Sequence, residues 1–264
     1  CKETGPVTIH FYALCILAGI IFAVWLGRVR YQSFGGDPED ISEAAAWAIP
    51  AGIIGGRLYH VITSPQKYFG KNGTPSDAFK IWEGGLGIWG AISLGAFAAF
   101  LFYRTHKTSL NFPYFLDALA PGVVIAQAIG RLGNWFNVEL FGSPSTLPWA
   151  LSVPKFDRPY GYAEFATYHP TFLYELIWCL LVAFLLLKLP GKLKNIVKNP
   201  GDLFALYVLG YTCGRLWIEA LRIDESNHIF GVRLNIWVSI VVLAGSSTYL
   251  LKSRAKPENQ SLAS

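Results

Sequence analysis

Long apolar stretches separated by short polar connections dominate this chain. A helix needs about 20 mostly apolar residues to cross a bilayer, and a backbone that faces lipid must satisfy its own hydrogen bonds. Seven segments meet this length approximately, so we predict an all-α integral membrane protein with a bundle of seven transmembrane helices. The predicted helices are Ile9–Gly27, Ala45–Thr63, Gly87–Tyr103, Pro113–Trp135, Thr171–Leu189, Asp202–Leu221 and Leu234–Leu251.

These helices are expected to form one membrane domain over residues 1–251, because no internal repeat or soluble segment interrupts them. The longest connection, about 136–170, is rich in Pro, Ser and aromatic residues and is expected to form a small cap. Residues 252–264 are polar and are expected to form a disordered tail. The first apolar stretch has no clear small-residue cleavage site, so we interpret it as a helix and not as a removed signal peptide.

Composition agrees with a membrane protein. The chain is 53% hydrophobic and 15% charged, whereas a soluble domain carries about a quarter charged residues. The net charge of +5 does not indicate nucleic acid, because the basic residues are spread between apolar spans, where topology and anionic lipid headgroups explain them better. The four cysteines form no CxxC pair and no Cys/His cluster, so neither a disulfide framework nor a metal site is expected.

The distribution of Lys and Arg predicts the orientation. Eleven basic residues lie in the connections of one side, mostly in short dense loops, against eight on the other. Cytoplasmic loops carry the excess of basic residues. We therefore predict that the N-terminus lies outside, the C-terminus lies in the cytoplasm, and the cap is extracytoplasmic. Polar residues near the ends of several predicted helices then collect toward the extracytoplasmic face.

The segment Gly130–Gly142 holds the densest group of these polar residues. It places Arg131, Asn134, Asn137 and Glu139 at the end of an apolar segment, where ionisable groups tend to mark a functional site. A guanidinium can bind a phosphate or carboxylate with two parallel hydrogen bonds. The alternatives are interfacial snorkelling of Arg131 or a structural salt bridge with Glu139, and the density of polar residues favours anion binding.

The neutral residues of this segment are open to two interpretations. Asn134 and Asn137 either hold a lipid headgroup or cap the helix end. Gly142 permits either close approach of a lipid or tight packing. Tyr12, near the outer end of the first helix, is either an interfacial aromatic or a headgroup contact.

A second polar group lies in the last predicted helices. Arg215 and Glu219 are four residues apart and share a helix face, as a structural ion pair or as a second arginine for the same anion. Glu175 lies inside an apolar helix with Tyr174 before it, so it needs a partner and one of the arginines is suitable. His169 precedes that helix and is either a base near neutral pH or a hydrogen-bonded cap.

Two glycine-rich segments, Gly52–Arg57 and Gly84–Gly90, lack the spacing of phosphate-binding loops. Small residues let membrane helices approach closely, so helix packing is the expected role of these glycines. Packing does not explain Arg57, which remains a candidate lipid-binding residue.

Together these motifs resemble the bacterial prolipoprotein diacylglyceryl transferase family. The segment from Gly130 to Gly142 is similar to that family's hallmark, which runs from glycine-arginine-x-glycine-asparagine through a glutamate to a terminal glycine. Motifs resembling the family's others recur in matching order from Tyr12 to about Glu225. They are Gly55-Gly56-Arg57, Trp82-Glu83-Gly84-Gly85, His169-Pro170 with Tyr174-Glu175, and Arg215 with Glu219.

The resemblance implies an enzyme of the bacterial plasma membrane that acts at its outer face. Such an enzyme transfers the diacylglyceryl group of phosphatidylglycerol to the lipobox cysteine of preprolipoproteins, forms a thioether and releases glycerol phosphate without a cofactor. By resemblance, Arg131 and Arg215 bind the phosphate and stabilise the leaving group. Residues implied in lipid binding are Asn134, Asn137, Glu139, Gly142, Tyr12, Arg57 and Glu219.

One position departs from the family pattern. Many members carry a histidine just after the glycine turn, where this chain has Trp89. Tryptophan is not a base, so the thiol either ionises under the influence of the arginines or loses its proton to His169, Glu139 or Glu219. Tyr174 and Glu175 are expected to support this chemistry.

A transporter or channel for an anionic solute or lipid is the alternative, with the same arginines in its pathway. Such proteins often carry inverted or parallel repeats with polar groups near the bilayer midplane. This chain shows no repeat, and its polar groups lie toward one face.

Overall fold

The computed structural model describes residues 3–4, 7–8, 11–70, 73–81, 84–137, 141–188, 196–224 and 228–255. Within them each predicted segment forms a long helix, and the molecule divides into two compact units, residues 28–115 and residues 1–27 with 116–264. The long helices are α1 (Phe11–Ser33), α2 (Pro38–Thr63), α4 (Ile88–Thr105), α5 (Phe112–Asn137), α6 (Thr171–Lys188), α7 (Asp202–Leu221) and α8 (Leu234–Ala255). Short elements are α3 (Gln66–Phe69), η1 (Pro75–Phe79) and η3 (Lys155–Asp157).

Five of the helices, α1, α4, α5, α6 and α8, are long and apolar enough to cross a membrane. Many large apolar side chains on them are exposed, including Ile21, Ile88 and Val241. An apolar surface of this kind is unsuited to water and is typical of contact with lipid. The prediction of a helical membrane protein therefore agrees with the structure, whereas the count of seven spans stays a prediction.

Three helix boundaries differ from the prediction by four residues or more. Helix α2 begins at Pro38 and not at Ala45, because the Asp37 side chain accepts a hydrogen bond from the Glu39 amide and Pro38 suits the first helical turn. Helix α1 continues to Ser33 and therefore includes Arg28 and Arg30, which the prediction assigned to a loop. Helix α8 continues to Ala255, four residues into the predicted disordered tail.

In the unit formed by residues 28–115, glycines bring α2 and α4 into backbone contact. A Cβ atom on Gly55 would collide with the Gly90 carbonyl oxygen, and one on Gly90 would collide with that of Gly55. The Gly87 amide also donates a hydrogen bond of 2.8 Å to the Gly56 carbonyl. The packing role expected for these glycine segments is confirmed at Gly55, Gly87 and Gly90, whereas an added Cβ atom on Gly84 would meet nothing within 4 Å.

Gly55→Ala is expected to lower the free energy of unfolding by about 1–3 kcal/mol, because the methyl group overpacks the contact between α2 and α4. The matched control is Gly245→Ala in α8, where nothing lies within 4 Å of the added Cβ atom. Alanine favours a helix over glycine equally at both sites. Thermal unfolding in detergent should therefore show opposite shifts, and a Gly55→Ala variant as stable as Gly245→Ala would contradict the contact.

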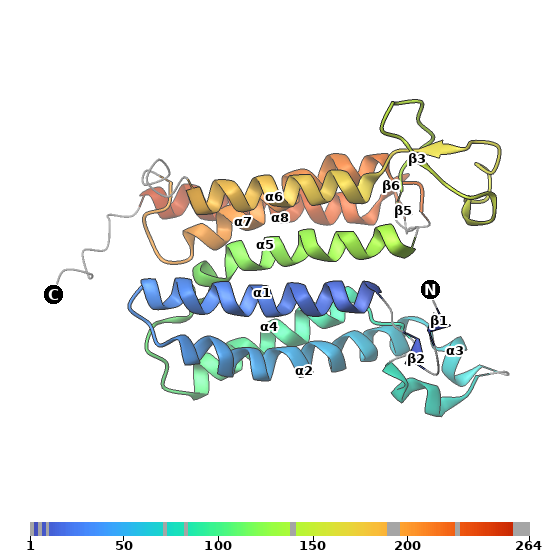
Figure 1. Ribbon diagram of the computed structural model, residues 1–264. Helices are drawn as coiled ribbons and strands as arrows, with labels where there is room; N and C mark the ends of the chain where they lie inside the picture. The colour runs from blue at the N-terminus through green and yellow to red at the C-terminus, as the bar shows by residue number, and fades with distance from the viewer. Residues whose placement is uncertain are drawn as a thin grey trace. The chain divides into compact units, whose positions relative to one another are not determined.

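In the other unit, α6 packs on α7 and α7 packs on α8, and Figure 1 shows these three helices side by side. The core of this unit is formed by α5, α6 and α7 and contains Val124, Cys179, Val182, Leu186 and Tyr207. Gly19 of α1 and Gly122 of α5 allow these two helices to approach closely. The end of α5, the start of α6, the end of α7 and the start of α8 therefore come to the same end of this unit.

Short antiparallel strand pairs complete this unit. They are β1 (Glu3–Thr4) with β2 (Val7–Thr8), β3 (Leu151–Ser152) with β4 (Thr167–Tyr168), and β5 (His228–Ile229) with β6 (Val232–Arg233). The second pair belongs to the connection predicted to form a cap. A small core of Phe141, Val153 and Tyr168 holds that connection together, so it is a folded element, and its extracytoplasmic location stays a prediction.

Candidate functional site

The predicted polar residues of α5, α6 and α7 meet in one ion-pair network at this end of the unit. Arg131 lies in the last turns of α5, Glu175 in the first turns of α6, and Arg215 and Glu219 in the last turns of α7. The spacing of four residues places Arg215 and Glu219 on one face of α7, and their charged groups lie 2.8 Å apart.

Glu175 is the centre of the network. Glu175 is 3% exposed, and its carboxylate binds both predicted arginines. Oε1 accepts a hydrogen bond of 2.6 Å from Nη2 of Arg131, and Oε2 accepts one of 3.1 Å from Nη1 of Arg215. Tyr211, one turn before Arg215, donates to Oε1 at 3.0 Å. The expected pairing of Glu175 with an arginine is confirmed, and this single carboxylate holds two guanidinium groups together.

Glu219 is the second, fully buried carboxylate. Its Oε2 lies 2.8 Å from Nη2 of Arg215 and 3.8 Å from Nη1 of Arg222. Its Oε1 accepts hydrogen bonds from Nε of Arg233 at 2.9 Å and from Nδ2 of Asn235 at 3.0 Å. Both hydrogen bonds therefore fall on Oε1, whereas within the described part of the chain the buried Oε2 has no hydrogen-bond partner and is balanced by the charges of Arg215 and Arg222 alone.

Asp224 closes the network beyond α7. Arg222 binds it with two hydrogen bonds of 2.7 and 2.9 Å, and Nη2 of Arg233 lies 3.1 Å from its Oδ2. Burial raises the pKa of Asp224, but the hydrogen bonds and charge of Arg222, together with Arg233, outweigh burial and hold this pKa below its ordinary value. Asp224 is therefore charged at neutral pH.

The balance of charge leaves room for an anion. In the described part of the chain, four arginines of the network face the three carboxylates Glu175, Glu219 and Asp224, which leaves one excess positive charge. The side chains of Arg131 and Arg215 are each 19% exposed, whereas those of Arg222 and Arg233 are 8% and 9% exposed. The positive charge is therefore accessible mainly at Arg131 and Arg215.

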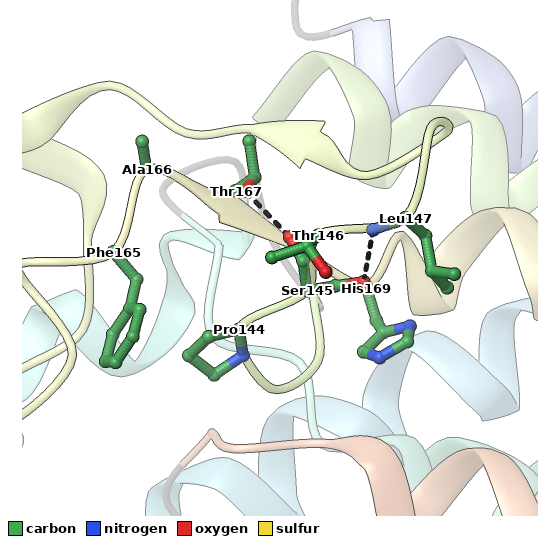
Figure 2. A pocket seen from close by; sticks show the side chains of 8 residues that line it. All are labelled: Pro144, Ser145, Thr146, Leu147, Phe165, Ala166, Thr167 and His169. Carbon is green, nitrogen blue, oxygen red and sulfur yellow. Dashed lines mark hydrogen bonds between the residues drawn. The ribbon is translucent and has the colours of Figure 1, made fainter.

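His169 lies in a separate pocket of the folded connection, which has a volume of about 490 Å³. Figure 2 shows the lining side chains, which are those of Pro144 to Leu147, of Phe165 to Thr167 and of His169. The imidazole Nδ1 lies 3.1 Å from the hydroxyl of Tyr174, which accepts a hydrogen bond of 3.0 Å from Nε1 of Trp149. His169 is thus held through one ring nitrogen at the start of α6.

The amino-acid sequence of this chain matches a known protein family over most of its length. A family model described as prolipoprotein diacylglyceryl transferase matches residues 2–251. The chain belongs to the prolipoprotein diacylglyceryl transferase family. With its apolar helices, this membership makes the chain an integral membrane protein.

Curated relatives agree over most of the chain. A phosphatidylglycerol–prolipoprotein diacylglyceryl transferase of Cutibacterium acnes is 53% identical over 94% of this chain and 82% of its own length. One of Corynebacterium glutamicum is 52% identical over 96% of this chain and 83% of its own length. Transferase 2 of Streptomyces coelicolor is 51% identical, with coverages of 94% and 77%.

Within this diacylglyceryl transferase fold, Asn134 and Gly142 have different surroundings. Asn134 is 4% exposed, and its side-chain amide has no hydrogen bond to any described residue. Gly142 lies in backbone contact with the end of α7 and the start of α6. Its amide donates to the His169 carbonyl at 2.7 Å, and a Cβ atom would lie 2.7 Å from the Leu221 carbonyl oxygen. Gly142 therefore permits this close backbone packing because it has no side chain, independently of any contact with a ligand.

Three further predicted lipid-binding residues are Tyr12, Asn137 and Glu139. Tyr12 packs on Gly133, where a Cβ atom would collide with its ring, and it is 38% exposed. The Asn137 side chain and the whole of Glu139 lie outside the described residues. Their roles in this transferase stay predictions.

Arg57 belongs to the unit of residues 28–115, where its guanidinium group donates hydrogen bonds to backbone carbonyls. Its Nε donates to the Ala78 carbonyl at 2.8 Å, and its two amino groups donate to the carbonyls of Asp77, Gly84 and Gly85. All three nitrogen atoms are occupied, so Arg57 holds the connection that precedes α4, and its lipid-binding role stays a prediction. Glu83 lies outside the described residues, and Trp89, at the start of α4, is 45% exposed.

Sequence reasoning missed four participants: Tyr211, Asp224, Arg233 and Asn235. Tyr211 lies four residues before Arg215, so helical spacing was a usable signal for it. Arg233 was counted only as a loop charge. A glutamate inside an apolar helix needs cationic partners, so Glu219 indicated that further arginines bind it. The local sequence did not show that Arg233 is one of them. The described residues contain no group of three or more His, Cys, Asp or Glu side chains suited to a metal ion.

Proposed function

We propose that this protein transfers the diacylglyceryl group of phosphatidylglycerol to the lipobox cysteine thiol of preprolipoproteins, the first step of bacterial lipoprotein maturation. The observation that carries the proposal is the pair of partly exposed arginine side chains held on Glu175, in a chain of this family. The relatives' names state phosphatidylglycerol and prolipoprotein as their substrates. We propose no metal or organic cofactor for the reaction.

The chemistry requires a cationic site for the leaving group. The cysteine sulfur attacks the glyceryl carbon, a C–S bond forms, and the C–O bond to phosphate breaks. The electron pair of that bond stays on the phosphate oxygen, the thiol proton passes to a base, and glycerol phosphate leaves. Arg131 and Arg215 would bind the phosphate and stabilise the charge that develops on it. Both bind Glu175, which keeps their guanidinium groups close together before the lipid arrives.

The same face supplies neutral groups for the glycerol headgroup. Asn134 lies three residues after Arg131 on α5, which favours a headgroup contact by its amide beside that arginine. We propose that Asn137, Glu139, Gly142 and Tyr12 complete the headgroup site. Glu219 contributes through Arg215, because it is fully buried and its Oε2 lies 2.8 Å from Nη2 of that arginine.

The geometry favours His169 as the base over Glu219. Glu219 is fully buried and bound by cations, so a thiol has no access to it. His169 is half-buried in an open pocket, with Nδ1 on Tyr174 and Nε2 without a partner among the described residues. We propose that Nε2 accepts the thiol proton and that Tyr174 orients the ring.

His169→Gln is expected to lower kcat about 100-fold at pH 7, because a positioned base typically contributes between 10²- and 10⁴-fold. The defect should shrink above about pH 8.5, where a free cysteine ionises in solvent without a base. Transfer rates to a lipobox peptide between pH 6 and pH 9.5 measure this. Tyr174→Phe is the companion variant with a smaller loss, and a defect of His169→Gln that is constant over this range would contradict the role.

We further propose the topology that the charge distribution favours. Seven helices cross the plasma membrane, with the N-terminus outside, the C-terminal tail in the cytoplasm and the folded connection on the extracytoplasmic side. Residues 1–251 would act as one membrane domain. Accessibility of single cysteines placed at Ser152 and Arg254, which are both exposed, to an impermeant thiol reagent in intact cells, with the native cysteines removed, tests this orientation.

The family does not favour the alternative of an anion transporter or channel. Product analysis separates the two functions. Purified protein in phosphatidylglycerol vesicles with a lipobox peptide should yield a peptide whose mass has increased by one diacylglyceryl group in thioether linkage, together with glycerol phosphate. Flux of an anion without covalent product would overturn the proposed function.

A further inference from the structure

We propose that Arg233 is a positioning residue that keeps Arg215 available to the lipid phosphate by neutralising Glu219. This inference rests on the proposed function, because it concerns the affinity of the same site for phosphatidylglycerol. Arg233 lies outside the segments that resemble the family motifs, and within the described residues its side chain binds Glu219, Arg222 and Asp224 and neither Arg131 nor Glu175.

The contacts of Glu219 divide between its two oxygen atoms. Oε2 faces Arg215 at 2.8 Å, whereas Oε1 is taken by Arg233 at 2.9 Å and by Asn235 at 3.0 Å. Because Glu219 is fully buried, no solvent screens its charge. Without Arg233, this carboxylate would be balanced only by Arg215 at 2.8 Å and by Arg222, farther away at 3.8 Å. Arg215 would then be neutralised by a buried carboxylate and would attract an anionic headgroup less.

Arg233 is itself fixed in place. Its Nη1 donates to the carbonyls of Asp224 at 2.9 Å and Arg222 at 3.3 Å, and its Nη2 lies 3.1 Å from Oδ2 of Asp224. These bonds join the end of α7 to β6, immediately before α8. The side chain is 9% exposed, so it does not offer a direct contact to a lipid. Its effect on the ligand therefore passes through Glu219 and Arg215.

Arg233→Gln is expected to raise KM for phosphatidylglycerol about tenfold, within the range of coupling between residues of one network. Glu219→Gln removes the charge that Arg233 balances. In the Glu219→Gln background, Arg233→Gln should therefore change KM by less than about twofold, because no carboxylate is left to neutralise Arg215. An effect of Arg233→Gln on KM that is equal in both backgrounds would overturn the proposal, since it would mean that Arg233 only ties α7 to α8.

Arg233→Lys provides a second measurement that does not depend on the glutamine variant being folded. Lysine keeps the charge beside Glu219 and loses the fork that binds Asp224. We expect KM within about threefold of the wild-type value, and a tenfold rise in both backgrounds would overturn the charge argument. Thermal unfolding of every variant separates a loss of fold from a loss of affinity.

The matched control is Arg158→Gln. Arg158 binds the backbone carbonyls of Val153 and Ala163 and contacts no carboxylate among the described residues, so KM should not change. The wild-type assay separates this inference from the proposed function. Absence of thioether product from wild-type protein overturns the function, whereas product formation with no rise in KM for Arg233→Gln overturns only the role of Arg233.

Discussion

Arg131→Ala is expected to lower kcat/KM for diacylglyceryl transfer by about 100- to 1000-fold, the effect of removing one preorganised donor from a developing anion. The variant loses one of the two partly exposed guanidinium groups and removes the 2.6 Å partner of Glu175. Arg131→Lys should recover only part of the loss, because an ammonium group keeps the charge but not the planar fork. Formation of the thioether product from phosphatidylglycerol vesicles measures the rates.

Arg28→Ala is the matched control for this variant. Arg28 also pairs with a glutamate, Glu39, at 2.6 Å, but both side chains are exposed, and such pairs contribute between about 0 and 1 kcal/mol. Its transfer rate should equal that of the wild type. Wild-type activity in a folded Arg131→Ala variant would exclude Arg131 from the phosphate site.

Glu175→Gln is expected to reduce the free energy of unfolding by about 3 kcal/mol, as for loss of one partner from a buried ion pair. The glutamine keeps the shape of the side chain but leaves the charges of Arg131 and Arg215 close together without a carboxylate between them. We expect kcat to fall at least about tenfold, because the two guanidinium groups no longer share one anchor. Thermal unfolding in detergent and transfer rates measure the two effects.

An anionic lipid should compensate for the missing carboxylate. Phosphatidylglycerol should raise the melting temperature of Glu175→Gln more than that of the wild type, whereas phosphatidylcholine should not, because its headgroup carries no net charge. Glu39→Gln is the exposed control, whose stability should change little. Equal stabilisation of the wild type and Glu175→Gln by phosphatidylglycerol would show that the anion does not bind between Arg131 and Arg215.

Much of the helical architecture follows from the local sequence. Helix α7 begins and ends where predicted, and α6 and α8 begin where predicted, because apolar stretches of membrane length carry their own hydrogen bonding. The start of α2 was predicted too late, because its first turn is polar and only the cap at Asp37 marks it. A pattern of apolar residues alone does not register such a turn.

Some features of the candidate site were likewise predictable from the local sequence, and others were not. The spacing of Arg215 and Glu219, the position of Arg131 at a helix end and the unpaired charge of Glu175 were all visible in the sequence. The sequence did not show that Glu175 binds both arginines, because these ion pairs join residues that are 44 and 40 positions apart. The sequence also did not show that the guanidinium group of Arg57 binds backbone carbonyls, because those contacts depend on the path of the connection before α4.

The sequence by itself determined that this is a helical membrane protein of the diacylglyceryl transferase family, with charged residues at the ends of particular helices. Only the tertiary structure decided which charges meet, that Glu219 is shared between Arg215 and Arg233, and that Arg131 and Arg215 keep the accessible positive charge. The physical reason is that surfaces facing lipid and surfaces facing other helices are both apolar in a membrane protein. Hydrophobic pattern therefore specifies each helix, while the rotation and neighbours of that helix come from packing and from the pairing of buried charges.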